Sequence, residues 1–206
     1  MHCLPGSATI MNALVLRDER ELDAACERLS RAGALGCDTE TSGLRASSGR
    51  LFSIQFSDGE FSVLIPVSEG IPAGPFAEIL RSRSITKIFH NARFDLAFLA
   101  ANGLETRNVF DTMIAEKFLT RGARQGVGLA ETLYRYFAVD LDKSPRKKFH
   151  RKWNGIWTED LVRYALSDVV YLPRLRTEQL RWLTRLGLAN ACLEEMQRLF
   201  PDVNRR

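Results

Sequence analysis

The sequence predicts an α/β domain with a mixed sheet and a helical second half. Two observations favour this class. A hairpin signal and a strand–helix–strand unit both occur before residue 112, and only helical patterns follow. The 206 residues are 45% apolar and 26% charged, which is enough to build one domain with a full core. We therefore expect a single domain over residues 12–206 and a disordered leader over residues 1–11, with Met11 as an alternative start.

The chain begins with a helix that leads into the central strand. Arg17–Gly33 has apolar residues at helical spacing and ends in glycine, which predicts an amphipathic helix. Ala34–Leu44 starts apolar and ends just after a Ser-Gly pair, as is typical of a buried strand that runs into a turn. Leu51–Phe56 and Phe61–Val67 form a predicted hairpin, because these strand-like runs are joined by an Asp-Gly turn.

A strand–helix–strand unit follows a short helix at Phe76–Arg83. Ile85–His90 and Asn108–Asp111 have strand patterns, and Asn91–Ala101 between them has a helical one. Because such a unit joins parallel strands, the sheet should be antiparallel on its hairpin side and parallel on the other. Further helices are predicted at Thr112–Leu119, Leu129–Ala138, Glu159–Leu186 and Leu188–Phe200.

Several classes of protein and site are excluded by composition. No apolar run approaches the roughly 18 residues needed to cross a bilayer, and the start of the chain lacks a signal peptide, so we expect a cytoplasmic protein. The cysteines form no Cys-x-x-Cys pair, which argues against a zinc site and against a disulfide framework. His90 and His150 are expected to be satisfied polar groups and not metal ligands.

Two carboxylates lie in the central strand, at Asp38 and Glu40. Side chains two residues apart on a strand share a face, so these acids should lie side by side with only Thr39 turned away. Carboxylates held this close raise each other's pKa unless a cation lies between them. A divalent metal ion would supply that cation, and the alternative is a strand end whose acids are simply solvated.

Two further segments carry candidate partners for these acids. Asp95 follows the strand expected beside the central one, so its carboxylate should open toward Asp38, although an acid in a first helical turn also complements the helix dipole. Asn91 is a candidate ligand contact or a helix cap. Tyr164 and Asp168 are four residues apart and share one helix face, beside the apolar stripe, so they face a cleft or form a surface pair.

These residues carry a family resemblance. Asp38-Thr-Glu40, Asn91-x-x-Phe94-Asp95 and Tyr164-x-x-x-Asp168, in this order, resemble the three motifs of the four-acid (DEDD) 3′–5′ exonuclease superfamily, in its tyrosine-containing branch. The motifs look most like those of ribonuclease D and the proofreading domains of family A DNA polymerases. The resemblance covers about residues 35–175. It implies an RNase H-like fold, with a five-stranded mixed sheet and the site at one end of the central strand.

The resemblance also implies hydrolysis by two divalent ions, Mg²⁺ or Mn²⁺, which prefer oxygen ligands. Asp38 would bridge both ions, Glu40 and Asp168 would complete the site that activates water, and Asp95 would hold the second ion through water. Tyr164 would orient the attacking water toward the terminal phosphodiester. The expected products are nucleoside 5′-monophosphates.

A basic stretch precedes the helix with Asp168. Residues 143–152 contain six cationic side chains and no acid, whereas the whole chain has a net charge of only +4. This loop, with Phe149 and Trp153 nearby, would suit a phosphate backbone and stacked bases, or it is a solvated loop. Including the motif neighbours, the expected substrate contacts are Thr39, Leu44, Asn91, Phe94, Arg146, Lys147, Lys148 and Arg151. Among these, Leu44 matches the position where relatives place an apolar residue against the terminal base, with core packing as the alternative. Core packing is the preferred role of Phe94.

Three functions remain open. The first is a metal-dependent 3′–5′ exonuclease on single-stranded RNA or short oligonucleotides, the second is the same chemistry on DNA ends, and the third is a non-catalytic nucleic-acid-binding module. The chain ends about 40 residues after Asp168, so we expect a free-standing nuclease domain, and a homo-oligomer is an option. The apolar residues of the last helix would pack inward or onto a second copy, and they are Leu188, Cys192, Met196 and Leu199.

Overall fold

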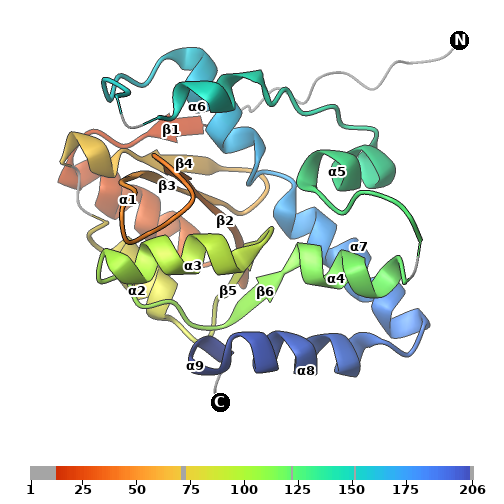
Figure 1. The fold of residues 1–206 in the computed structure, drawn as a ribbon. Coiled ribbons are helices and arrows are strands. Elements are labelled where there is room, and N and C mark those ends of the chain that lie inside the picture. Colours follow the sequence, from red (N-terminus) through yellow and green to blue (C-terminus); the bar gives the residue numbers. More distant parts are fainter. Residues whose placement is uncertain (1–12, 71–72, 122, 151, 205–206) are drawn as a thin grey trace, which may run out of the picture.

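In the computed structural model, residues 13–70, 73–121, 123–150 and 152–204 are described, and they form a mixed sheet flanked by helices (Figure 1). The strand order is β1-β4-β3-β2-β5-β6. The strands are β1 (Ala13–Val15), β2 (Ala34–Thr41), β3 (Leu51–Ser57), β4 (Ser62–Ile65), β5 (Thr86–Phe89) and β6 (Val109–Asp111). The leader predicted over residues 1–11 lies outside the described residues.

The directions of the strands confirm the predicted mixed sheet. β3 is antiparallel to both β2 and β4, whereas β2, β5 and β6 run parallel. The sheet has six strands, however, and not the expected five, because β1 adds a parallel edge strand beside β4. This strand is only three residues long, so its local pattern is weak, and it becomes a strand through pairing with β4.

The predicted hairpin between β3 and β4 is confirmed, and its turn is built as the Asp-Gly pair suggests. Asp58 accepts hydrogen bonds from the backbone N–H groups of Glu60 and Phe61, at 2.8 and 2.7 Å. Gly59 has φ +97°, a backbone conformation that other residues adopt rarely. The turn therefore sets the register that buries every side chain of both strands.

Helices cover both faces of the sheet. Gly36 of β2 approaches the chain between α6 and α7, whereas Thr39, which points to the other face, contacts α3. Figure 1 shows α6 and α7 following each other past the sheet toward α8. The helices are α1 (Glu19–Leu29), α2 (Phe76–Arg81), α3 (Ala92–Ala101), α4 (Thr112–Leu119), α5 (Leu129–Phe137), α6 (Glu159–Ser167), α7 (Leu172–Arg185), α8 (Ala189–Leu199) and α9 (Pro201–Asn204), with 3₁₀ turns η1 (Val67–Glu69) and η2 (Ser144–Lys148).

The helix predicted over Glu159–Leu186 is wrong as a single element, since it is divided into α6 and α7. Pro173 has no N–H to donate to the Val169 carbonyl, which instead accepts a bond from Leu172 at 3.2 Å. That carbonyl lies so close to β2 that a Cβ atom at Gly36 would be only 2.3 Å from it. The break in the helix therefore lets the chain dock closely on the central strand.

The apolar residues of α8 mostly face inward. Cys192 and Met196 are buried and Leu188 packs against the core, whereas Leu199 is exposed. Inward packing thus accounts for three of the four positions that the sequence left open. In the ranges that the structure describes, no helix is long and apolar enough to cross a membrane.

Replacing Gly36 with alanine should test the close approach of β2 to the α6–α7 junction. The new methyl group would collide with the Val169 carbonyl, so we expect a loss of about 1–3 kcal/mol in the free energy of unfolding, measured by urea denaturation. Gly33→Ala is the matched control, because a Cβ atom there meets nothing within 4 Å. Equal stability of the two variants would contradict the packing described here.

Candidate active site

The site forms where β2 extends beyond the end of its pairing with the parallel strand β5. β2 pairs with β5 only over Ala34–Gly36, so its next residues have an open edge on that side. On its other edge, β2 stays paired with β3 and has a register shift between Glu40 and Thr41. The open edge starts just before the two acids of the first motif. Backbone and side-chain groups of β2 are therefore free there to meet residues from other elements.

Asp95 fills this open edge from the first turn of α3. Its carboxylate accepts a hydrogen bond from the Thr39 hydroxyl at 2.7 Å, and only 2% of Asp95 is exposed. Thr39 was expected to turn away from Asp38 and Glu40, and it does so, but its side chain is the one that holds Asp95. Thr39 is buried, and its hydroxyl has this protein partner.

Asp111, at the end of β6, fixes the start of α3. Its carboxylate accepts hydrogen bonds from the backbone N–H groups of Asn91 and Ala92 (3.1 and 2.8 Å), and it also caps α4. Asn91 is the N-cap residue of α3, with φ 72°, as its alternative role predicted, but its side chain makes no cap hydrogen bond. The sequence analysis missed Asp111 as a support of the site, although an Asp before a helical pattern is a signal for a cap.

Asp168 and Tyr164 enter the site from α6. Both are buried, and Asp168 forms an ion pair with Lys143 Nζ at 2.5 Å. The same Nζ atom lies 5.5 Å from the centroid of the Tyr164 ring. Lys143 belongs to the basic stretch, but its spacing from the motifs gives no sign that it would reach an acid of the third motif. The structure therefore places a cation among these acidic groups.

The acids from three distant segments influence one another electrostatically. Burial and then the carboxylates of Asp95, Asp168 and Glu40 raise the pKa of Asp38 well above its usual range. For Glu40 the causes of the raised pKa are burial and then the charge of Asp168, and Lys143 opposes the shift. Burial raises the pKa of Asp95 to about 7, although hydrogen bonds from Thr39 lower it. The pKa of Asp168 is also raised by burial, against the opposing charge of Lys143.

This arrangement is a cluster of largely buried acids that repel one another. Burial and the charges of Glu40 and Asp168 also raise the pKa of the Tyr164 hydroxyl, which therefore stays protonated. In the described ranges, no three acidic, histidine or cysteine side chains are already positioned as ligands around one point. Lys143 contacts Asp168 there and offsets part of the negative charge.

The basic loop lies beside this cluster of acids. The charge of Arg146 lowers the pKa of both Glu40 and Asp168, and Arg146, Lys147 and Lys148 are exposed. Arg151 lies outside the described residues. Phe149, which was expected to help stack bases, is buried instead in an aromatic cluster whose other members are Phe52, Trp153, Trp157 and Tyr164. The cluster anchors the loop to the sheet, because Phe149 and Trp153 pack on Phe52 of β3.

The other predicted contacts divide into exposed and packed residues. Leu44 is 80% exposed on the loop after β2, and Asn91 is exposed at the start of α3. Phe94 packs on Phe98 with ring centroids 5.1 Å apart, in agreement with a core role. Both ring nitrogens of His90 are hydrogen-bonded, to Thr112 and to Val127, as expected for a satisfied polar histidine.

Comparisons with known proteins agree with the motifs. The profile of a family described as 3′–5′ exonuclease matches residues 14–181. Ribonuclease D of Jannaschia sp. is 33% identical over 180 residues, which are 79% of this chain and 45% of the relative. The crystal structure of Escherichia coli RNase D, described as an exoribonuclease involved in structured RNA processing, has a TM-score of 0.78 at 31% identity and covers 91% of this chain and 49% of its own.

Structures of Brucella melitensis NrnC are also similar. The one with bound Mg²⁺ has a TM-score of 0.72 at 33% identity, over 88% of this chain and 84% of that chain. The one bound to pGG has a TM-score of 0.70 at 35% identity, over 79% and 78%. This chain spans about half the length of the ribonucleases D that it matches.

Lys143→Met should destabilise the protein in a chelating buffer, because it leaves the Asp168 carboxylate buried without its cation. About a third of the Lys143 side chain is exposed, so we expect a modest loss of about 1–2 kcal/mol at pH 8, seen as a lower melting temperature. Lys147→Met is the control, since Lys147 is exposed. The role of Lys143 is refuted if both variants melt at the wild-type temperature.

Asp95→Asn should make the chelated protein more stable at high pH. Because the folded protein raises the pKa of Asp95 to about 7, this carboxyl supports folding in acid and loses that contribution as the pH rises through 7. The stability gained by the variant should therefore be small near pH 4 and grow toward pH 8 in urea denaturation. Asp23→Asn, at an exposed position of α1, is the control. A constant difference for Asp95→Asn would contradict the raised pKa.

Proposed function

This chain belongs to the 3′–5′ exonuclease family, and on that premise we propose that it hydrolyses single-stranded RNA or short oligonucleotides from the 3′ end, releasing nucleoside 5′-monophosphates. The observation that carries the proposal is the meeting of Asp38, Glu40, Asp95 and Asp168 at the open end of β2. Acids from three segments that repel one another do not stabilise a fold, so a functional role accounts for them better than a structural one.

Two divalent ions, Mg²⁺ or Mn²⁺, would suit the donor chemistry of these four acids. The four acids offer only carboxylate oxygens, which are the ligands that such ions prefer, and their raised pKa values reflect negative charge that lacks enough compensation. Asp38, Glu40, Asp95 and Asp168 would hold the ions. When bound, such ions make a water molecule a better nucleophile and stabilise the leaving 3′-oxygen. The Mg²⁺ seen in an NrnC structure supports this assignment.

The remaining residues would bind and orient the substrate. The Tyr164 hydroxyl stays protonated beside Glu40 and Asp168, so it can donate a hydrogen bond that orients a water molecule or a phosphate oxygen. Thr39 acts through Asp95, whose carboxylate it holds in place. The exposed Leu44 and Asn91 suit contacts with the terminal nucleotide, and Phe94 helps to pack α3 against the core.

The basic loop would hold the phosphate backbone at the site. Arg146, Lys147 and Lys148 are exposed, Arg146 is near enough to affect two of the acids, and Arg151 belongs to the same basic stretch. RNA or short oligonucleotides are favoured as substrates because the similar proteins are ribonucleases D and NrnC, one of whose structures holds pGG. The alternative is the same chemistry on DNA ends, as in repair or proofreading in trans.

Asp38→Asn should abolish hydrolysis of 5′-labelled RNA in Mn²⁺ or Mg²⁺. Loss of several kcal/mol of transition-state stabilisation corresponds to a kcat lower by on the order of 1,000-fold. Tyr164→Phe should slow hydrolysis less, and Asp23→Asn should leave it unchanged. A chelator should stop the wild-type enzyme, and the product should be nucleoside 5′-monophosphate.

Matched RNA and DNA of two to 24 nucleotides, given to the wild-type protein, decide between the alternatives. Faster hydrolysis of RNA supports the proposal, and faster hydrolysis of DNA supports the alternative on DNA ends. Substantial metal-dependent activity of Asp38→Asn would overturn the assignment of the site. A wild-type protein that binds the strands without cleaving them would be a non-catalytic binding module.

A further inference from the structure

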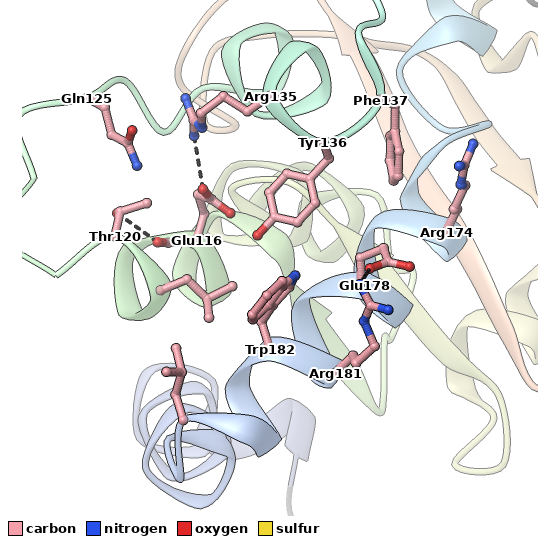
Figure 2. A pocket seen from close by; sticks show the side chains of 12 residues that line it. Glu116, Thr120, Gln125, Arg135, Tyr136, Phe137, Arg174, Glu178, Arg181 and Trp182 are labelled. Atoms are coloured by element: carbon pink, nitrogen blue, oxygen red, sulfur yellow. Dashed lines mark hydrogen bonds and ion pairs between the residues drawn. The ribbon is translucent and has the colours of Figure 1, made fainter.

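A cavity of about 610 Å³ lies between α4, α5 and α7, and the proposed reaction does not use it (Figure 2). None of the four acids lines it. Figure 2 shows Tyr136 and Trp182 extending toward each other from α5 and α7, with Glu116 on one side and Arg181 on the other. The other lining residues include Arg135, Phe137, Arg174 and Glu178.

Arginines of α7 lie beside aromatic rings of α5 and α7 at this cavity. The guanidinium of Arg174 lies 4.3 Å from the centroid of the Phe137 ring. Those of Arg181 and Arg185 lie 5.6 and 5.5 Å from the centroid of Trp182, a side chain that is 41% exposed. Exposed aromatic faces and guanidinium planes side by side are the features with which proteins hold single-stranded nucleic acids.

The charges in the cavity leave a positive group available to a ligand. Arg135 is paired with the buried Glu116 at 3.0 Å, and Arg181 with Glu178 at 2.6 Å. Within the described ranges, Arg174 has no carboxylate at ion-pair distance, and its guanidinium only covers Phe137. A ligand that suits this wall has a flat ring for Trp182 and an anionic group for Arg174. An apolar helix does not suit it, because the lining is charged.

α7 leads along the chain from Asp168 to the cavity. α7 begins four residues after Asp168, and the ring of Tyr171, just before α7, stacks on Phe137 with centroids 6.4 Å apart. Trp182 is eight residues beyond Arg174, roughly 12 Å along a helix. A strand whose 3′ end lies at the acids would thus reach the cavity with nucleotides further upstream.

We propose that this cavity is an upstream binding site for single-stranded nucleic acid, in which Trp182 stacks on a base and Arg174 binds a backbone phosphate. The inference rests on the proposed function and adds that the affinity depends on the length of the bound strand. A dinucleotide fills only the site at the acids, whereas a longer strand occupies both sites. Long strands therefore bind more tightly than short ones, and the extra affinity comes from α7.

The experiment compares a 16-nucleotide RNA with a dinucleotide, using Arg174→Gln/Trp182→Ala in the full chain. Binding is measured in an Asp38→Asn background, which prevents cleavage, and kcat/KM is measured in the active protein. We expect a Kd for the 16-nucleotide RNA that is weaker by roughly tenfold or more, and a Kd for the dinucleotide within about twofold of the parent. The slope of log Kd against log salt should fall by about 0.7 for the lost phosphate contact.

Two control variants test whether the effect is specific to the cavity. Arg198→Gln/Leu199→Ala removes one exposed cation and one exposed apolar side chain from α8, far from the cavity in sequence, and should change neither Kd. Neutralising Arg146, Lys147 and Lys148 in the basic loop should weaken binding of both RNAs, since these residues belong to the site at the acids. The mass in solution of each variant is measured by sedimentation.

The outcomes separate this inference from the proposed function. Equal effects on both RNAs, or no effect on either, would overturn the upstream site while leaving hydrolysis by the wild-type protein intact. A changed mass in solution for the cavity variant would overturn it too, because the cavity would then be a contact between copies. Loss of affinity for the long RNA alone supports it, even if the wild-type protein cleaves neither RNA and the proposed function fails.

Discussion

The close contact between β2 and the junction of α6 and α7 is the constraint on which the site depends. Gly36 has no Cβ atom, so the Val169 carbonyl can lie in the space that a Cβ atom would occupy. Pro173 interrupts the helical hydrogen bonds at this carbonyl, because proline has no N–H to donate to it. Asp38 is two residues from one side of this contact, and Asp168 is next to the other side. A small error in this packing would separate the two carboxylates, so the site is as well defined as the core beneath it.

The second constraint is the repulsion among the acids, which the protein offsets only in part. Thr39 donates a hydrogen bond to Asp95, and Lys143 forms an ion pair with Asp168. Asp38 and Glu40 keep pKa values well above the usual range, because burial and neighbouring charge act in the same direction. The fold gives up stability to keep these groups together, as is common where residues serve chemistry and not packing.

Positively charged side chains lie around the acids and the cavity. The whole chain is only slightly basic, but its positive charges are concentrated next to the acids in the basic loop, and three arginines line the cavity beside α7. A polyanionic substrate would meet repulsion at the acids and attraction around them. The buried Phe149 fixes the loop, whereas Trp182 remains 41% exposed, so the second surface offers a ring to a base.

By itself the sequence determined the order of most helices and strands, the mixed sheet, and the motifs with Asp38, Glu40, Asp95, Tyr164 and Asp168, because periodicity and spacing are local properties that side chains express directly. Only the tertiary structure decided the features that depend on partners far away in the chain. These are the edge strand β1, the division between α6 and α7, the cap by Asp111, the placement of Lys143 at Asp168 and the cavity beside α7. Although Asp111 and Pro173 carry local signals for a cap and a helix break, the contacts that these features make are with segments far away in the chain.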